Sequence, residues 1–210
     1  MPGVSVITFW RPWRDMRRLF AVVRGYAAAD DPRAAAGNLV ALVLAWNTPF
    51  YPLYLLGAAG SAMWPGGLLT LCVLPLFLAV PAVIRRNEFA GRVMLALTGT
   101  GNTLFCTWLL GEASGTQLFL FPCVTLAALL FRRRERLALF GLLALPILAG
   151  VVLNGRYPVS PFACRDCGGI LWMNALSATI LVAFLGVLAT GLVPRGSDAP
   201  HTRRPESPPW

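Results

Sequence analysis

The chain carries, at residues 64–88, the stretch WPGGLLTLCVLPLFLAVPAVIRRNE. Residues 64–84 contain no charged side chain, and a run of this length is what an α-helix needs to cross the hydrocarbon core of a bilayer. The run then ends at Arg85 and Arg86. An uncharged segment that ends in adjacent arginines is typical of a transmembrane helix with a basic loop at one membrane surface.

The rest of the chain repeats this pattern of apolar segments and short polar loops. We predict six transmembrane helices, near residues 38–57, 64–84, 92–111, 116–131, 137–153 and 170–193. The segments 116–131 and 137–153 are shorter than the roughly 20 residues that a perpendicular span requires, so tilt or local thinning of the bilayer is expected there. The predicted fold is therefore an all-α polytopic membrane bundle of six transmembrane helices.

The composition supports a membrane protein. Hydrophobic residues make up 57% of the 210 residues and charged residues only 13%, and the mean hydropathy is +0.65. Soluble domains contain about 25% charged residues. These values exclude an ordinary soluble enzyme, a disordered chain and a coiled coil. The chain has a single histidine, His201, so no multi-histidine metal site is expected, and we predict neither a metal nor a cofactor.

The distribution of arginine predicts the orientation. All basic residues are arginines, and all except Arg156 and Arg165 fall in the N-terminal segment, in the second and fourth loops or in the tail. Because arginine accumulates on the cytoplasmic side, both termini are predicted to be cytoplasmic. We predict three regions: a cytoplasmic basic amphipathic segment (1–37), a transmembrane domain (38–193) and a disordered cytoplasmic tail (194–210).

The N-terminal segment has the pattern of an amphipathic helix that lies in the membrane interface. Its apolar residues recur at helical spacing, at Phe9, Trp13, Met16, Phe20 and Val23. The arginines expected to contact lipid headgroups are Arg11, Arg14, Arg17 and Arg18. A nucleic-acid-binding role is the alternative, but one short basic stretch beside a span supports it weakly, and we predict no nucleic acid partner.

Cys164 and Cys167 lie in the long loop that the arginine distribution places outside. Two thiols at this spacing form a small disulfide, exchange with other disulfides or supply half of a zinc site. The side on which the loop is predicted to lie favours a disulfide that holds the loop in one shape. A redox role stays open as the alternative, although Cys72, Cys106 and Cys123 fall inside predicted spans and no relay pair is present on that side.

Polar residues inside the predicted spans suggest a buried ligand site. Pro49 and Pro52 should kink or unwind the first span, which frees backbone carbonyls. The alternatives are a kink filled by neighbouring helices and, for the third span, small residues that serve helix packing. The candidate ligand-binding residues are Asn47, Tyr51, Asn102, Glu112 and Asn174.

The predicted spans carry no acidic residue at mid-membrane, which counts against proton-coupled transport and voltage sensing. The chain also contains no nucleophile motif, P-loop or dinucleotide fingerprint. An enzyme is therefore not the leading expectation.

The third and fourth spans carry a short pattern found elsewhere. Its parts are Leu110-Gly111-Glu112-Ala113-Ser114-Gly115, Leu118-Phe119-Leu120-Phe121-Pro122, Leu130-Phe131-Arg132 and Glu135-Arg136. It resembles the six-helix membrane-associated sensor modules of bacteria, which precede adenylate cyclase, diguanylate cyclase or histidine kinase domains.

The resemblance implies a multi-pass sensor in the bacterial inner membrane that forms a homodimer and has cytoplasmic termini. We expect no output domain after the sixth predicted span, and therefore expect a signal to pass to a separate cytoplasmic partner. The leading prediction is a non-enzymatic sensor that binds a small or lipophilic ligand within the bundle and otherwise contacts membrane lipids. A membrane thiol–disulfide oxidoreductase that uses Cys164 and Cys167, or a small transporter, is the alternative.

Overall fold

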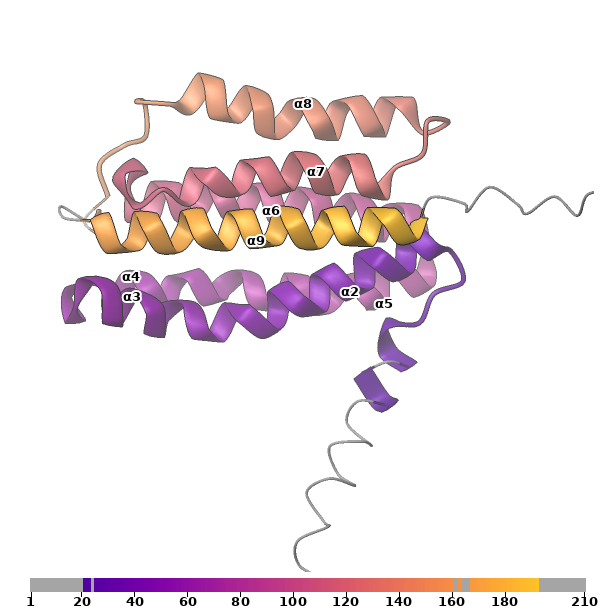
Figure 1. Ribbon diagram of the computed structural model, residues 1–210, viewed down its shortest axis with the longest axis horizontal. Coiled ribbons are helices and arrows are strands. Elements are labelled where there is room, and N and C mark those ends of the chain that lie inside the picture. The colour runs from indigo at the N-terminus through magenta and orange to yellow at the C-terminus, as the bar shows by residue number, and fades with distance from the viewer. Residues whose placement is uncertain (1–20, 24, 161, 164–166, 193–210) are drawn as a thin grey trace, which may run out of the picture.

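The computed structural model describes residues 21–23, 25–160, 162–163 and 167–192, and this part of the chain forms an all-α bundle (Figure 1). In the described residues, five helices are long and apolar enough to cross a membrane: Pro32–Ala59, Ser61–Arg86, Glu88–Leu110, Arg136–Leu153 and Gly168–Leu192. The fourth predicted segment is a shorter apolar helix, Thr116–Leu130. At 1.5 Å per residue it reaches about 22 Å, less than the ~30 Å of the hydrocarbon core. The predicted all-α membrane class is confirmed, with five membrane-length helices and one shorter apolar helix.

The first two spans are each built from several helical pieces. The first contains α2 (Pro32–Asn47), the 3₁₀ turn η2 (Thr48–Phe50) and α3 (Tyr51–Ala59). The second contains η3 (Ser61–Met63), α4 (Trp64–Leu69), η4 (Thr70–Val73) and α5 (Leu74–Arg86). Most of these pieces begin with a proline in their first turn, where its missing N–H costs no helical hydrogen bond.

The remaining elements are more regular. They are α6 (Glu88–Leu110), η5 (Glu112–Ser114), η6 (Thr116–Phe119), α7 (Leu120–Leu130), α8 (Arg136–Leu153) and α9 (Gly168–Leu192). Single residues separate the second span from the first and third spans, because capping residues end and begin these helices sharply. Gly60 ends the first span at φ 80°, a conformation that glycine adopts without strain, and the Asn87 side chain accepts a hydrogen bond from Ala90 N–H at the start of α6.

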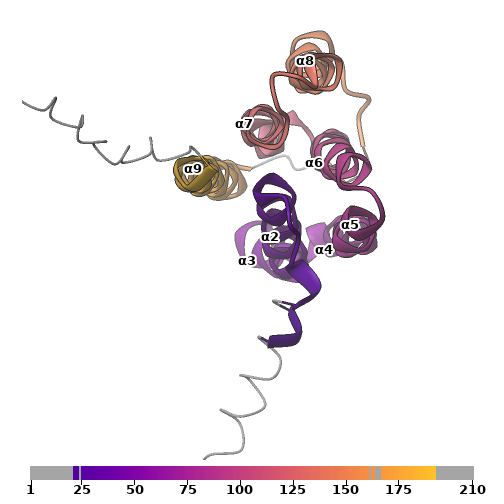
Figure 2. The same cartoon turned by 90° about the vertical axis from the view of Figure 1, so that its right-hand side faces the viewer.

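Helix α6 has the largest buried share of the membrane-length helices found in the described residues. It lies between α5 and α7 (Figure 2) and also contacts α2 and α8. Helix α8 lies on the outside of α7, and its only fully buried residue is Pro146. The exposed apolar side chains of α8 and α9 are therefore the surface that a bilayer would cover.

Two apolar clusters form the core. The larger contains Val80, Leu95, Leu130 and Leu185 and occupies the half of the bundle near the α7–α8 loop. The smaller contains Leu55, Leu109 and Ile170 near the opposite end.

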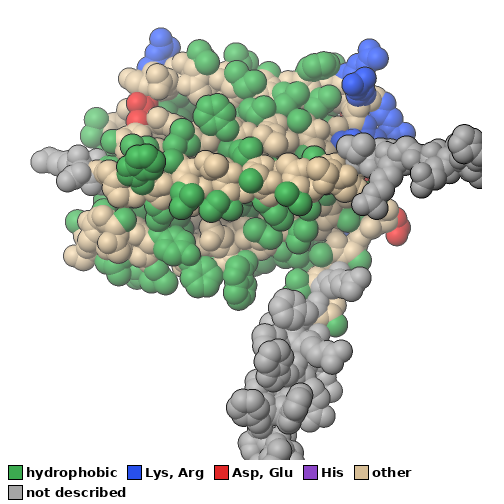
Figure 3. Space-filling view, in the orientation of Figure 1, with side chains coloured by type: hydrophobic (Ala, Val, Ile, Leu, Met, Phe, Trp, Pro, Cys, Tyr) green, Lys and Arg blue, Asp and Glu red, His purple; other side chains and the backbone are tan. Residues whose placement is uncertain are grey.

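The described arginines are concentrated at one end of the bundle, which also carries the chain ends of the described part (Figure 3). This end, called the basic end below, contains the α5–α6 and α7–α8 turns. Arg156 lies at the opposite end, after α8. The helices thus arrange the arginines as the alternation of loops predicts, while the side of the membrane that each end faces stays a prediction.

Part of the predicted N-terminal segment is described. Residues 25–27 are helical, and the Tyr26 hydroxyl donates to Leu78 O (2.8 Å) while the Arg85 guanidinium lies 4.4 Å above its ring. The headgroup arginines Arg11, Arg14, Arg17 and Arg18 lie outside the described residues, as does the predicted tail 194–210.

Candidate functional site

The first span changes its helical type where its prolines fall. Because Pro52 has no N–H to donate, Thr48 O accepts instead from Tyr51 N–H in the 3₁₀ turn. The Thr48 hydroxyl donates to Leu44 O (2.7 Å) and so occupies another carbonyl near the break. The break predicted at Pro49 and Pro52 is present as this 3₁₀ turn between α2 and α3.

A cavity of about 120 Å³ lies beside this break, between the two apolar clusters. Apolar and aromatic side chains make up most of its wall, including Val73, Phe77, Phe119, Leu126 and Leu185. Its polar residues are Asn47, Thr48, Tyr51, Thr70, Asn102, Thr103 and Thr116. No charged side chain is among the residues that line it. We call it the central cavity.

The hydroxyl protons around the central cavity are all used within the protein. The bonds run from Thr48 to Leu44 O (2.7 Å), Thr70 to Gly67 O (2.6 Å), Thr103 to Gly99 O (2.9 Å), Thr116 to Thr107 Oγ1 (3.2 Å) and Tyr51 to Asn174 Oδ1 (3.2 Å). A hydroxyl whose proton is already donated offers only lone pairs. These groups can therefore accept hydrogen bonds from a ligand but not donate them.

Two amides remain available as donors. Asn47 makes no side-chain hydrogen bond within the described residues, and Asn102 only accepts one, from the Cys106 thiol (3.5 Å). The amide NH₂ groups of Asn47, which is exposed, and of Asn102, which is half-buried, are thus the unpartnered donors of a wall that carries no charge. A polar group in such surroundings gains free energy when an acceptor reaches it.

Asn174 lies next to the central cavity and is fully engaged by protein groups. Its amide nitrogen donates to Ser114 O (2.9 Å), and its oxygen accepts from the Tyr51 hydroxyl. The side chain is completely buried. It joins α9 to the turn after α6 and to α3, and so closes the cavity on that side.

Glu112 does not line the central cavity. Its carboxylate accepts a hydrogen bond from Gly155 N–H (2.7 Å) and so connects the turn after α6 to the end of α8. Of the five candidate residues, the structure brings Asn47, Tyr51 and Asn102 to one cavity, places Asn174 directly behind Tyr51 and sets Glu112 apart.

Of the five cysteines, Cys72 is a free and exposed thiol of the second span. Cys106 and Cys123 are buried free thiols that line the central cavity, a role that the sequence does not indicate beyond their being apolar span residues. Cys167 is buried and does not carry a free thiol. Cys164 lies outside the described residues, so the predicted pairing of Cys164 with Cys167 stays a prediction.

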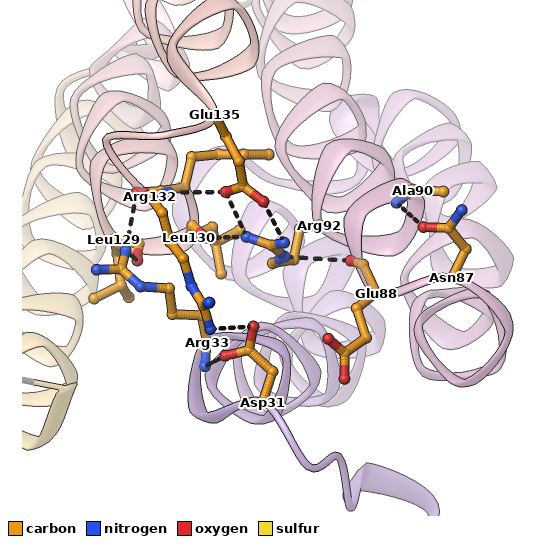
Figure 4. Close-up of polar contacts among 11 residues, drawn as sticks. Asp31, Arg33, Asn87, Glu88, Ala90, Arg92, Leu129, Leu130, Arg132 and Glu135 are labelled. Carbon is orange, nitrogen blue, oxygen red and sulfur yellow. Dashed lines mark hydrogen bonds and ion pairs between the residues drawn. The ribbon is translucent and has the colours of Figure 1, made fainter.

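A second polar cluster closes the basic end of the bundle (Figure 4). Arg92 of α6 is 4% exposed and forms two hydrogen bonds to the Glu135 carboxylate (2.7 and 3.0 Å). It also donates to Leu130 O (2.7 Å) at the last turn of α7 and to Glu88 O (3.3 Å). We call the Arg92–Glu135 pair and its bond to α7 the arginine clamp.

Neighbouring groups extend the arginine clamp. Arg33 of α2 donates to Leu129 O (2.6 Å) and Phe131 O (2.9 Å), so arginines from two helices cap the carboxyl end of α7. Arg132 pairs with Asp31 (2.8 Å), the residue that caps α2. The cluster therefore ties α2, α6, α7 and the start of α8 together.

The protonation of Glu135 follows from these contacts. The hydrogen bonds from Arg92 hold the pKa of this carboxyl below its ordinary value of 4.5, with a further contribution from Arg132 N–H. The carboxylate is therefore charged at neutral pH. Glu135 and Arg92 are 43 positions apart in the sequence, so their pairing could not be predicted from local pattern. The sequence shows only that Arg92 lies one turn inside an apolar helix and therefore needs a partner.

The family model MASE7 matches residues 23–193. The chain belongs to the MASE7 family. MASE7 is a membrane-associated sensor family, so the resemblance to bacterial membrane-associated sensor modules is confirmed. The family match and the apolar helices of the described residues together indicate a membrane-associated sensor. No curated protein and no solved structure matches this MASE7 chain significantly.

Proposed function

We propose that this MASE7 chain binds a small, uncharged, lipophilic ligand in the central cavity and passes the signal to a separate partner at the basic end. The observation that carries the proposal is the pair of unpartnered amides, Asn47 and Asn102, in a wall without charge. An ionic ligand would lose its hydration there without gaining a counter-charge. A lipophilic molecule with an acceptor oxygen would satisfy both amides and displace solvent from apolar surface.

The same helices carry the cavity and the clamp. Helix α6 bears Asn102 and Arg92, ten positions apart and so about 15 Å along the axis. Helix α7 lines the cavity with Pro122 and Cys123 and ends at the carbonyls that the arginines cap. A ligand that binds one arrangement of α6 and α7 better than another shifts the population of that arrangement, and the clamp shifts with it.

The basic end supplies a surface for the partner. Five described arginines there have exposed side chains: Arg85, Arg86, Arg133, Arg134 and Arg136. None of them forms an ion pair within the described residues. An acidic protein face would find complementary charge beside the clamp, which supports a cytoplasmic partner at this end.

Two glycines of α6 allow a matched test of ligand binding. Gly99 lines the central cavity, and a Cβ there would sit 3.6 Å from the Cys123 sulfur, whereas a Cβ at Gly101 would meet nothing within 4 Å. We expect Gly99→Leu to fill the cavity and Gly101→Leu to leave it open. Organic extracts of the purified wild-type protein and of Gly101→Leu should contain a lipophilic compound by mass spectrometry that extracts of Gly99→Leu lack. Identical extracts from all three proteins would contradict the proposal.

The coupling to the basic end has its own readout. Arg132 N–H donates to the Glu135 carboxylate (2.8 Å), so its hydrogen exchange reports on the arginine clamp. Filling the cavity with Gly99→Leu should change the exchange of this amide several-fold, and Gly101→Leu should not. An unchanged amide in Gly99→Leu would separate ligand binding from signalling and refute the second half of the proposal.

A further inference from the structure

A second hollow lies on another face of α7, between α7 and α8. It encloses about 400 Å³ and is lined by residues of η6, α7 and α8 and by the chain that follows α8. None of its lining residues lines the central cavity. Gly150 leaves it open, because a Cβ at that position would already lie 3.2 Å from Leu120. We call it the α7–α8 groove.

Most of the α7–α8 groove is apolar and faces outward. Its rim residues Phe121, Ile147 and Val151 are 67%, 52% and 73% exposed. These residues belong to the spans, so the surrounding medium is the hydrocarbon of the bilayer. Helix α8 contacts α7 and α6 but leaves this side without a protein neighbour in the described chain.

One end of the groove is polar. Gln117, Asn154 and Tyr157 lie there, and the Tyr157 hydroxyl is buried with Thr107 and Glu112 as its polar neighbours. Burial, with the nearby Glu112 carboxylate, raises the pKa of Tyr157, so the phenol is a protonated donor at neutral pH. The polar groups therefore sit where the groove reaches the end of the spans.

The chain beside the polar end carries one arginine, Arg156, which does not itself line the groove. Arg156 is exposed, adjoins Tyr157 in the chain and forms no ion pair within the described residues. Glu112, a carboxylate of the same end, is held by Gly155 N–H. An apolar trough with amides, a phenol and an arginine at one end has the polarity profile of a phospholipid, with acyl chain, ester carbonyls and phosphate in that order.

We propose that the α7–α8 groove binds one phospholipid, with an acyl chain along Leu120 and Ile147 and the phosphate beside Arg156. The amides of Gln117 and Asn154 lie where the ester carbonyls would accept hydrogen bonds. A phospholipid fits better than a helix of a second copy, because the polar end offers donors and a cation that an apolar helix would leave unpaired. This site is independent of the central cavity and does not rest on the proposed sensor function.

Helix α8 provides a matched pair of variants for the test. Gly150 borders the groove, while a Cβ at Gly141 of the same helix would meet nothing within 4 Å. Native mass spectrometry of protein purified in a mild detergent should show one retained phospholipid in the wild type and in Gly141→Leu. Gly150→Leu should retain at least tenfold less, and Arg156→Gln, a change at an exposed side chain, several-fold less.

Addition of defined lipids to delipidated protein distinguishes the contribution of the acyl chains to binding from that of the headgroup. Palmitoyl-oleoyl phosphatidylglycerol should raise the thermal midpoint of the wild type, and the matching diacylglycerol, which lacks the phosphate, should raise it less. Arg156→Gln should remove the difference between the two lipids. Equal lipid retention in all variants would overturn the proposal. A wild-type dimer that Gly150→Leu converts to a monomer would also overturn it and assign the groove to a second copy.

Discussion

Arg92 and Asn102 lie on the same helix, yet their surroundings are opposite in character. Arg92 reaches four acceptors, and its charge is matched by Glu135. Asn102 accepts one weak hydrogen bond from a thiol and lines the central cavity. The arginine clamp is thus a saturated polar cluster, and the central cavity is an incomplete one.

The difference indicates how such a bundle can be both stable and responsive. A saturated buried network resists change, because moving any member leaves another unpaired. An incomplete site gains free energy only when an outside molecule completes it. A sensor needs both: a rigid reference at one end and a gap whose occupancy shifts helices against that reference.

The largest expected effect comes from breaking the arginine clamp. Glu135→Gln leaves Arg92 buried without a counter-charge, a situation that costs roughly 3–5 kcal/mol. The variant should lower the thermal midpoint in detergent strongly. The control is Arg136→Gln, which should leave the midpoint unchanged, because Arg136 is exposed and forms no ion pair within the described residues. Equal midpoints for the two variants would show that the clamp contributes nothing to stability.

The second largest loss of stability is expected at Asn174, which is hydrogen-bonded within the protein but lies beside the central cavity. Asn174→Leu would leave Ser114 O and the Tyr51 hydroxyl without their partners, at a cost of about 1–3 kcal/mol. Tyr51→Phe removes only one of the two bonds and should cost less. Chemical denaturation of both variants measures the two losses in the free energy of unfolding. A larger loss in Tyr51→Phe than in Asn174→Leu would show that Tyr51 contributes more to stability than Asn174 does.

Much of this fold can be predicted from the sequence. The uncharged run 64–84 lies within the observed second span, Ser61–Arg86, because the energetic cost of charge in a bilayer defines the segment almost alone. The break at Pro49 and Pro52 follows equally from backbone chemistry. Such features depend on neighbouring residues only, and a single sequence contains them.

The partners of the polar groups could not be predicted in the same way. Asn47, Asn102 and Asn174 all appear as polar residues within spans, but only the rotation and order of the helices determine that Asn174 is paired and the other two are not. The pairing of Arg92 with Glu135 crosses two helices for the same reason. The apolar pattern of a segment predicts that it is a membrane helix, but it does not determine which other helix packs against each of its faces.

Acid should weaken the clamp more gently than substitution does. Glu135 has a lowered pKa in the folded protein, so its stabilising contribution is fully present above the ordinary value of 4.5 and is lost as the pH falls through the lower folded value. The thermal midpoint of the wild type should therefore fall on acidification below pH 4.5 more steeply than that of Glu135→Gln. Parallel curves would place the acid-sensitive group elsewhere.

The smallest expected change in stability is at the central cavity. Asn102→Leu removes an amide whose NH₂ has no protein partner, so the free energy of unfolding should change by less than about 0.5 kcal/mol or rise slightly. The same variant should lose the compound that co-extracts with the wild type, because one of the two available donors is gone. Asn102→Leu would then affect ligand binding without affecting stability, whereas the main effect of Glu135→Gln would be a loss of stability. A loss of stability in Asn102→Leu comparable to that in Asn174→Leu would instead make Asn102 part of the packing of α6.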